Sequence, residues 1–135
     1  MEVEWLILAD AAQVVGNKLY LMGGGWDRLT VNSSFPVNQQ IGLAVSFRVP
    51  WNETNQKHVF ELDIVSEDGQ SIGKFGGGVE VGRPEGIPPG QDQRIQIAIN
   101  GAIRFANQGT YVIVAQTDGR EMRRVVFSVT PAAAT

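Results

Sequence analysis

"QIGLAVSFRV", residues 40–49, is the stretch that decides the fold. Large apolar residues occupy every second position, and small or polar residues fill the positions between them. A period of two residues is that of a β-strand, whose successive side chains point to opposite faces of a sheet. We therefore predict a half-buried strand. Its core face is formed by Ile41, Leu43, Val45, Phe47 and Val49.

The same alternation recurs along the chain after this strand. It is found in "HVFELDIV" (58–65), "RIQIAIN" (94–100) and "RVVFSV" (124–129). Residue pairs that tolerate the positive φ angles of two-residue hairpin turns separate the apolar runs: Gly16-Asn17, Asp68-Gly69 and Asp118-Gly119. No stretch has a convincing helical period. We predict an all-β fold, an antiparallel β-sandwich of about nine short strands.

"RPEGIPPGQDQR", residues 83–94, is the longest stretch without strand character. Pro84, Pro88 and Pro89 exclude it from the middle of a sheet, because proline cannot donate a ladder hydrogen bond. Long connections in a compact domain are often either functional or the return of a Greek key, and the charged residues here form no recognisable site. We predict an ordered Greek-key crossover.

Two glycine triplets raise the question of phosphate binding. They are residues 23–25 in "LMGGGWDRL" and residues 76–78 in "KFGGGVEV". A phosphate-binding glycine loop lies between a strand and a helix, whose N-terminus supplies further donors. Both triplets are followed by strand-like sequence instead. We predict that they allow a bend, a bulge or a close backbone contact.

Length and composition favour one ordinary globular domain. A chain of 135 residues buries enough surface to need neither a metal nor a disulfide for stability. We predict a single domain over residues 1–130 and a flexible C-terminal tail over residues 131–135. The net charge of −3 argues against nucleic-acid binding, which depends on neutralising many phosphates.

The compartment follows from what the sequence lacks. The chain has no cysteine, which excludes thiol catalysis, thiolate metal sites and a disulfide framework. Glutamates stand near its start, where a signal peptide would carry positive charge, and no apolar run approaches the roughly 20 residues of a membrane-spanning helix. We expect a cytoplasmic protein without a cofactor, a nucleic-acid partner or a membrane partner.

Catalytic chemistry has few candidate residues. His58 is the only histidine, and no Gly-x-Ser-x-Gly motif accompanies it. The candidate metal ligands show no ligand spacing. They are Asp10, Asp27, His58, Glu61 and Asp63. We predict neither a catalytic nor a metal site, and an enzyme that uses an aspartate with His58 is the third of our three hypotheses.

A ligand-binding module is the second hypothesis. Trp51 stands in the polar stretch "RVPWNETNQKH", where an exposed indole could stack on a sugar ring. Amide side chains able to hydrogen-bond hydroxyl groups follow it, at Asn52, Asn55 and Gln56. The alternative is that Trp51 caps one end of the core.

A binding or assembly module without enzymatic activity is the first hypothesis. The segments "EWLILADA" and "YVIVAQ" are apolar on both faces. This pattern fits either strands covered on both sides or a sheet face that contacts another subunit. We predict the second and expect a homo-oligomer. The expected interface residues are Leu6, Leu8, Val112 and Val114.

The C-terminal segment "FANQGTYVIVAQTDGREMRRVVFSV" resembles the final hairpin of immunoglobulin-like sandwiches. Gly109 and Tyr111 match the tyrosine-corner pattern of those folds. The resemblance implies that Tyr111 is buried, with its hydroxyl bonded to backbone near residues 105–108. The cysteine pair of antibody domains is missing, and Trp51 follows its strand instead of lying within it.

The N-terminal segment "LADAAQVVGNKLYLMGGGWDRL" resembles the opening of a small bacterial family of unknown function. Its shared features are a short strand, a Gly-x-Lys-Leu hairpin and a "G-x-x-D-x-L" strand that leads into the sandwich. The similarity continues through "FPV" and the Gly-x-Tyr end. It implies an immunoglobulin-like β-sandwich and supplies no catalytic residues.

Overall fold

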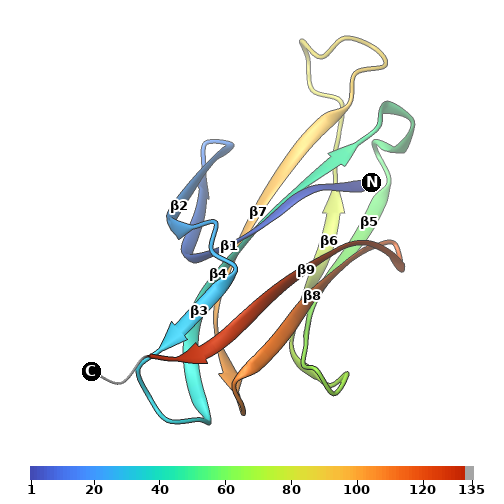
Figure 1. Cartoon of the computed structure of the whole chain (residues 1–135). Coiled ribbons are helices and arrows are strands. Elements are labelled where there is room, and N and C mark those ends of the chain that lie inside the picture. The colour runs from blue at the N-terminus through green and yellow to red at the C-terminus, as the bar shows by residue number, and fades with distance from the viewer. Residues whose placement is uncertain (133–135) are drawn as a thin grey trace.

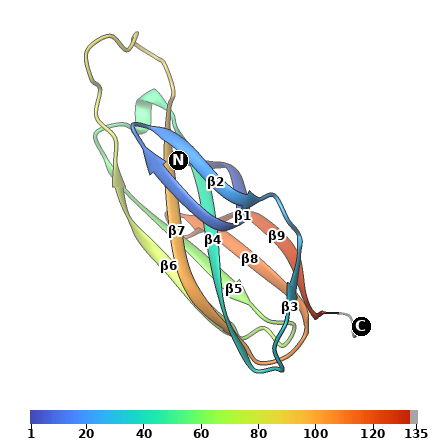
Figure 2. The same cartoon turned by 90° about the vertical axis from the view of Figure 1, so that its left-hand side faces the viewer.

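The computed structural model describes residues 1–132, and they form two β-sheets packed face to face (Figures 1 and 2). The first sheet has the order β2-β1-β4-β7. Its strands are β1 (Glu2–Val15), β2 (Lys18–Gly24), β4 (Val37–Val49) and β7 (Gln93–Phe105). The second has the order β3-β9-β8-β5-β6. Its strands are β3 (Arg28–Val31), β5 (Lys57–Val65), β6 (Ser71–Glu80), β8 (Gly109–Thr117) and β9 (Arg120–Pro131).

The prediction of an all-β sandwich with about nine strands is confirmed. The one helical element among the described residues is the single turn η1 (Trp51–Glu53). The expectation of purely antiparallel sheets is wrong at one place, because β3 pairs parallel with β9. A short strand at the edge of a sheet can pair parallel when the chain enters it from the other sheet, and β3 follows β2 of the first sheet.

The predicted core face of β4 is confirmed, but the expectation of a half-buried strand is wrong, because Gly42, Ala44 and Ser46 on its other face are buried as well. All five of its alternate apolar residues, from Ile41 to Val49, are at most 1% exposed. The facing strand β5 contributes Phe60, Leu62 and Ile64, which are also buried. The ring of Phe47 lies 5.2 Å from that of Phe60, between centroids, and so joins the two sheets.

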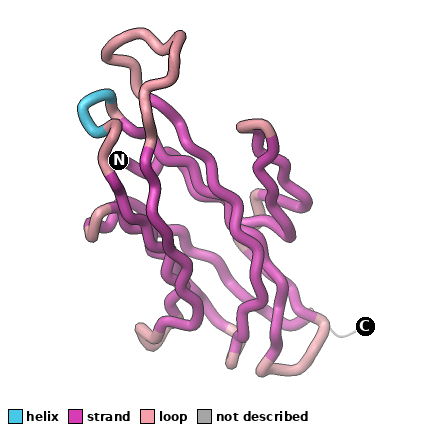
Figure 3. Tube along the Cα trace, turned by 180° about the vertical axis from the view of Figure 1, so that it is seen from behind, coloured by secondary structure: helices cyan, strands magenta, loops and turns pink. Residues whose placement is uncertain are grey.

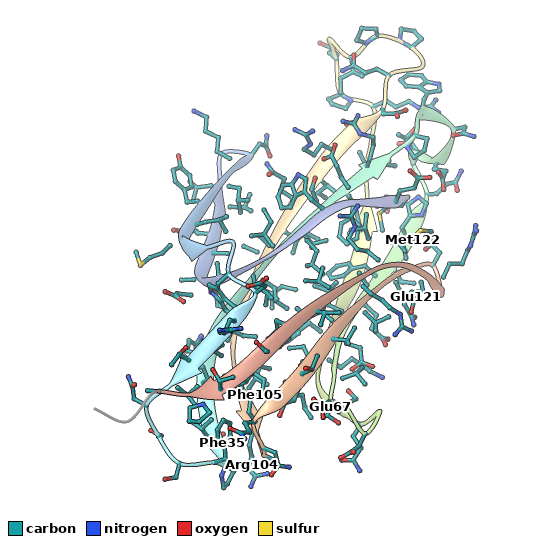
Figure 4. The ribbon with its side chains drawn as sticks, in the orientation of Figure 1. Phe35, Glu67, Arg104, Phe105, Glu121 and Met122 are labelled. Carbon is teal, nitrogen blue, oxygen red and sulfur yellow. The ribbon has the colours of Figure 1, made fainter. Side chains whose placement is uncertain are left out.

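The predicted tyrosine contact is present at the end of the sandwich that holds Phe105, opposite Met122 (Figure 4). The Tyr111 hydroxyl donates a hydrogen bond to the Asn107 carbonyl over 2.5 Å. Its ring packs on Phe105 and stacks on Phe127, at centroid distances of 5.0 and 5.8 Å. Burial raises the pKa of the Tyr111 hydroxyl, so this group remains a donor at neutral pH.

The proline-rich connection runs from β6 of the second sheet to β7 of the first, as expected of a crossover between sheets (Figure 1). Gly86 and Gly90 supply its positive φ angles. The Arg83 side chain anchors its start by donating to the Thr54 hydroxyl and the Trp51 carbonyl.

The predicted C-terminal tail lies mostly outside the described residues. β9 extends to Pro131, and the N–H of Ala132 donates to the carbonyl of Val31. Residues 133–135 are beyond the part of the chain that the structure describes. The flexibility of the tail therefore stays a prediction.

Candidate functional site

The two halves of strand β1 pair with different strands. Up to Ala9 it pairs with β4, where Ala9 faces Gly42. Beyond Ala9 it pairs with β2, from Ala9 opposite Gly24 to Val15 opposite Lys18. Residues 10–24 therefore form a β-hairpin that leaves the first sheet and lies against its outer face, and we call it the arm (Figures 1 and 3).

Glycines allow the arm to leave the sheet. A Cβ atom on Gly42 would lie 2.9 Å from the Cα of Ala11, closer than side-chain carbons approach backbone in real structures. Gly23 has a φ of +59°, and the carboxylate of Asp10 occupies the space that its side chain would fill. The first glycine triplet therefore ends β2 with a bend, as predicted. Gly25 completes this bend with a φ of +90° and an N–H bonded to the Leu8 carbonyl.

Two polar side chains of β7 hold the arm against the outer face of the first sheet. Asn100 accepts from the N–H of Ala12 over 2.9 Å and donates to the Ala12 carbonyl over 2.7 Å. These two hydrogen bonds satisfy backbone groups of Ala12 that a neighbouring strand would otherwise satisfy. Gln96 donates to the carbonyl of Asn17 at the arm's turn. The arm is thus fixed to the rest of the sandwich, which we call the body, through hydrogen bonds to its backbone.

The arm collects most of the exposed apolar surface. Six large hydrophobic side chains are exposed among the described residues, and four of them lie on the arm. They are Val15, Tyr20, Leu21 and Met22, and Met22 is 71% exposed. The other two, Val59 and Val126, lie on separate strands of the second sheet. A hollow of about 420 Å³ opens beside Tyr20, Met22 and Asn100.

A cluster of charged side chains links three strands of the first sheet. The carboxylate of Glu4 on β1 accepts from Arg48 on β4 and Arg94 on β7, and also from the hydroxyl of Ser46. These donors, Arg94 first among them, lower the pKa of Glu4 to about 2. Glu4 is therefore ionised at neutral pH and cross-links three strands.

The expected interface residues fall into two groups. Leu6 and Leu8 are buried between the sheets, so the expectation that they form a subunit interface is wrong. The two leucines lie opposite Val45 and Leu43 of β4, and residues directly opposite each other on neighbouring strands share a face, which here is the core face. Val112 and Val114 alternate on β8 with the core residues Tyr111, Ile113 and Ala115, so they lie on the outer face, where Val112 is half-buried and Val114 is buried. Their role as an interface stays a prediction.

The expected ligand-binding residues do lie together, around the turn η1. The guanidinium of Arg83 stacks over the Trp51 ring at 3.9 Å from its centroid. Gln56 donates to the Asn52 carbonyl, while Asn55 is exposed and has a φ of 58°. One face of the indole is thus covered by a cation. A sugar-binding role for Trp51, Asn52, Asn55 and Gln56 stays a prediction.

His58 lies at the end of β5 beside a carboxylate, but both of its ring nitrogens are occupied. Nδ1 is 2.8 Å from the Asp118 carboxylate, and Nε2 is 2.8 Å from the Glu53 carbonyl. Both partners are acceptors, so this arrangement favours the doubly protonated ring, in which both nitrogens donate. These bonds, the one to Glu53 first, raise the pKa of His58, and the bond from His58 lowers the pKa of Asp118. Among residues 1–132 no three potential ligands gather in a way that could hold a metal ion.

The position of the arm does not follow from the sequence. The sequence predicts an ordinary hairpin of the sandwich here. Alternation within a strand does not show whether a hairpin stays in its sheet or folds over the outer face of that sheet. One signal was available. Between Asp10 and Gly25 the only charged residues are Asp10 and Lys18, which is unusual for a hairpin that faces water.

Comparison with known proteins gives a family and no activity. Neither a curated protein nor a solved structure matches the chain. In the described residues no helix has the length and hydrophobicity needed to cross a bilayer. A family model matches residues 4–130. This match covers nearly the whole chain, and the chain belongs to a family of unknown function, DUF6941.

Proposed function

We propose that this chain is a non-enzymatic assembly module that associates with copies of itself. The observation that carries the proposal is the gathering of Val15, Tyr20, Leu21 and Met22 on one projecting arm. Single exposed apolar residues are common on monomers, whereas a cluster of them usually marks a contact surface. The bonds of Asn100 and Gln96 keep this cluster away from the core.

The absence of an enzymatic role is supported by the state of His58. A general base needs a ring nitrogen that can reach a substrate. Here one nitrogen is bonded to Asp118, the other to Glu53, and the side chain is 4% exposed. This arrangement suits a structural imidazolium that joins β5 to the β8–β9 turn.

We also propose an immunoglobulin-like strand arrangement and a cytoplasmic location. The arrangement is supported by the Tyr111 hydroxyl contact, by the parallel pairing of β3 with β9 and by the crossing of the chain between sheets after β2, β3, β4, β6 and β7. The location is supported by the lack of cysteine. The bacterial origin suggested by the resemblance stays an expectation.

Molar mass by light scattering, measured across a dilution series, tests the proposed function. We expect a mass above 14.7 kDa at high concentration that falls toward this value on dilution. High salt should preserve the association, since an apolar contact is screened little. A mass of 14.7 kDa at every concentration would overturn the proposal.

A further inference from the structure

Strand β2 is an unprotected edge. It is the outermost strand of the first sheet and pairs only with β1 among the described strands. Its outward backbone N–H and C=O groups can therefore pair with an added strand. Proteins usually guard such edges with charges, prolines or bulges, and β2 carries one charged residue, Lys18, at its start.

The other sheet edges differ from β2 in ways that discourage strand addition. β7 carries Arg94 and Arg104, β6 carries Lys74 and Glu80, and β3 is only four residues long. β2 alone combines a seven-residue length with a run of exposed apolar side chains. If a strand is added to this protein, β2 is the edge that favours it.

We propose, on the basis of the assembly function above, that β2 pairs antiparallel with β2 of a second copy around a two-fold axis. In an isologous pair the same residues serve both copies, and an antiparallel strand pair has a two-fold axis of this kind. The two arms then form one four-stranded sheet in the order β1-β2-β2-β1. The contact closes on itself, so it yields a dimer and leaves no further β2 edge.

The length of β2 fixes the register. The seven residues Lys18–Gly24 overlap fully with their copies only when Leu21 faces Leu21, and the bend at Gly23 then lies near each end of the paired strands. In this register Tyr20 lies opposite Met22 of the other copy, on both sides of the axis. A thioether beside an aromatic ring is a favourable contact, and it covers the two most exposed side chains of the arm.

The charges of the arm complement each other in this arrangement. The arm has one cationic residue, Lys18, at the start of β2 and one anionic residue, Asp10, beside the end of β2. Neither has an ion-pair partner among the described residues. Antiparallel pairing brings the Lys18 end of each strand to the Asp10 end of the other. Parallel pairing would place like charges together.

The natural lack of cysteine makes a direct test possible. In the variant Leu21→Cys the two introduced thiols face each other across the axis, at a Cα separation of about 4.5 to 5.5 Å that a disulfide accepts. Val126→Cys is the matched control, because Val126 is also an exposed apolar strand residue, on the second sheet. Both variants are oxidised at a concentration where the unmodified chain is associated, and the dimer fraction is read on a non-reducing gel.

We expect the Leu21→Cys chains to form covalent dimers at least several-fold faster than the Val126→Cys chains. Lys18→Glu should weaken the association of the otherwise unchanged chain several-fold, because each end of the paired strands then carries two anionic groups in place of a cation and an anion. If the chain associates but the two cysteine variants cross-link equally, the β2 pairing is wrong and the assembly function stands. If the chain is monomeric at every concentration, both proposals fail.

Discussion

The two glycine triplets lie in the two contrasting regions of the molecule, one in the arm and one in the body. At the end of the arm, Gly23 and the following Gly25 have φ angles of +59° and +90°, and the triplet turns the chain. In the body, residues 76–78 continue β6 in regular register with β5, from Gly76 opposite Glu61 to Gly78 opposite Val59. The second triplet therefore does not bend the chain. It allows a close backbone contact with β5, which was the alternative prediction for a glycine triplet.

The difference shows that the same three-glycine sequence has a different structural role in each region. The two regions also differ in how much added side-chain volume they accept. A Cβ on Gly76 would lie 2.9 Å from the Phe60 carbonyl oxygen, and one on Gly77 would lie 3.3 Å from the Phe60 ring. The body is thus close-packed even at its glycines. The arm has open apolar surface instead, so we expect changes in the body to alter folding and changes in the arm to alter association.

The largest effect on stability is expected from Gly76→Ala. Its methyl group would meet backbone, which cannot move without disturbing β5, so we expect a loss of about 1 to 3 kcal/mol in the free energy of unfolding. Urea denaturation measures it. Gly78→Ala is the matched control, because the nearest atom to its Cβ is 3.8 Å away. Equal losses in both variants would show that the body is not close-packed at Gly76.

The second prediction concerns pH and also belongs to the body. The folded-state pKa of His58 is raised, so its contribution to stability is present below the unfolded value of about 6.5 and is lost as pH rises through the folded value. The pKa of Asp118 is lowered, so its contribution is present above the unfolded value of about 4 and is lost as pH falls through the folded value. The pair therefore stabilises most between these two unfolded values.

Unfolding measured against pH checks this expectation with His58→Gln as the comparison. The variant should lose more stability relative to the unchanged chain near pH 5 than near pH 9, values chosen on either side of the usual histidine pKa of about 6.5. An equal loss at both values would mean that the buried ring is neutral in the folded protein.

The third prediction tests the junction between the regions. Asn100→Leu removes the two bonds to Ala12, and we expect a loss of about 1 kcal/mol in unfolding free energy. Amide hydrogen exchange should accelerate most at Ala12 and its arm neighbours, while amides of β4 and β5 keep their protection. Asn38→Leu is the control, since Asn38 is exposed on β4 without a side-chain bond. Uniform acceleration over the whole chain would show that arm and body unfold together.

The sequence predicts the structure of the body better than that of the arm. Alternation identified the core faces of β4 and β5, because burial on one side imposes a two-residue period on any strand. It could not place Leu6 and Leu8, because a segment that is apolar on both faces does not show which face is the core. It missed the arm, because the contact of Asn100 with Ala12 joins positions 88 residues apart. The tyrosine contact was foreseen because its partners are four residues apart.

The smallest effect on folding, and the sharpest contrast with Gly76, is expected from Met22→Ser in the arm. Met22 is 71% exposed, so its replacement should change the unfolding free energy of the isolated chain by no more than about 0.5 kcal/mol. The same substitution removes a side chain that the β2 pairing would cover, so the dilution series should show a weaker association. Val126→Ser removes comparable exposed apolar surface from the body and should leave the association unchanged. Both substitutions remove an exposed apolar side chain, one from the arm and one from the body. An equal effect of both on association would mean that general surface hydrophobicity drives the association and that the arm is not the interface.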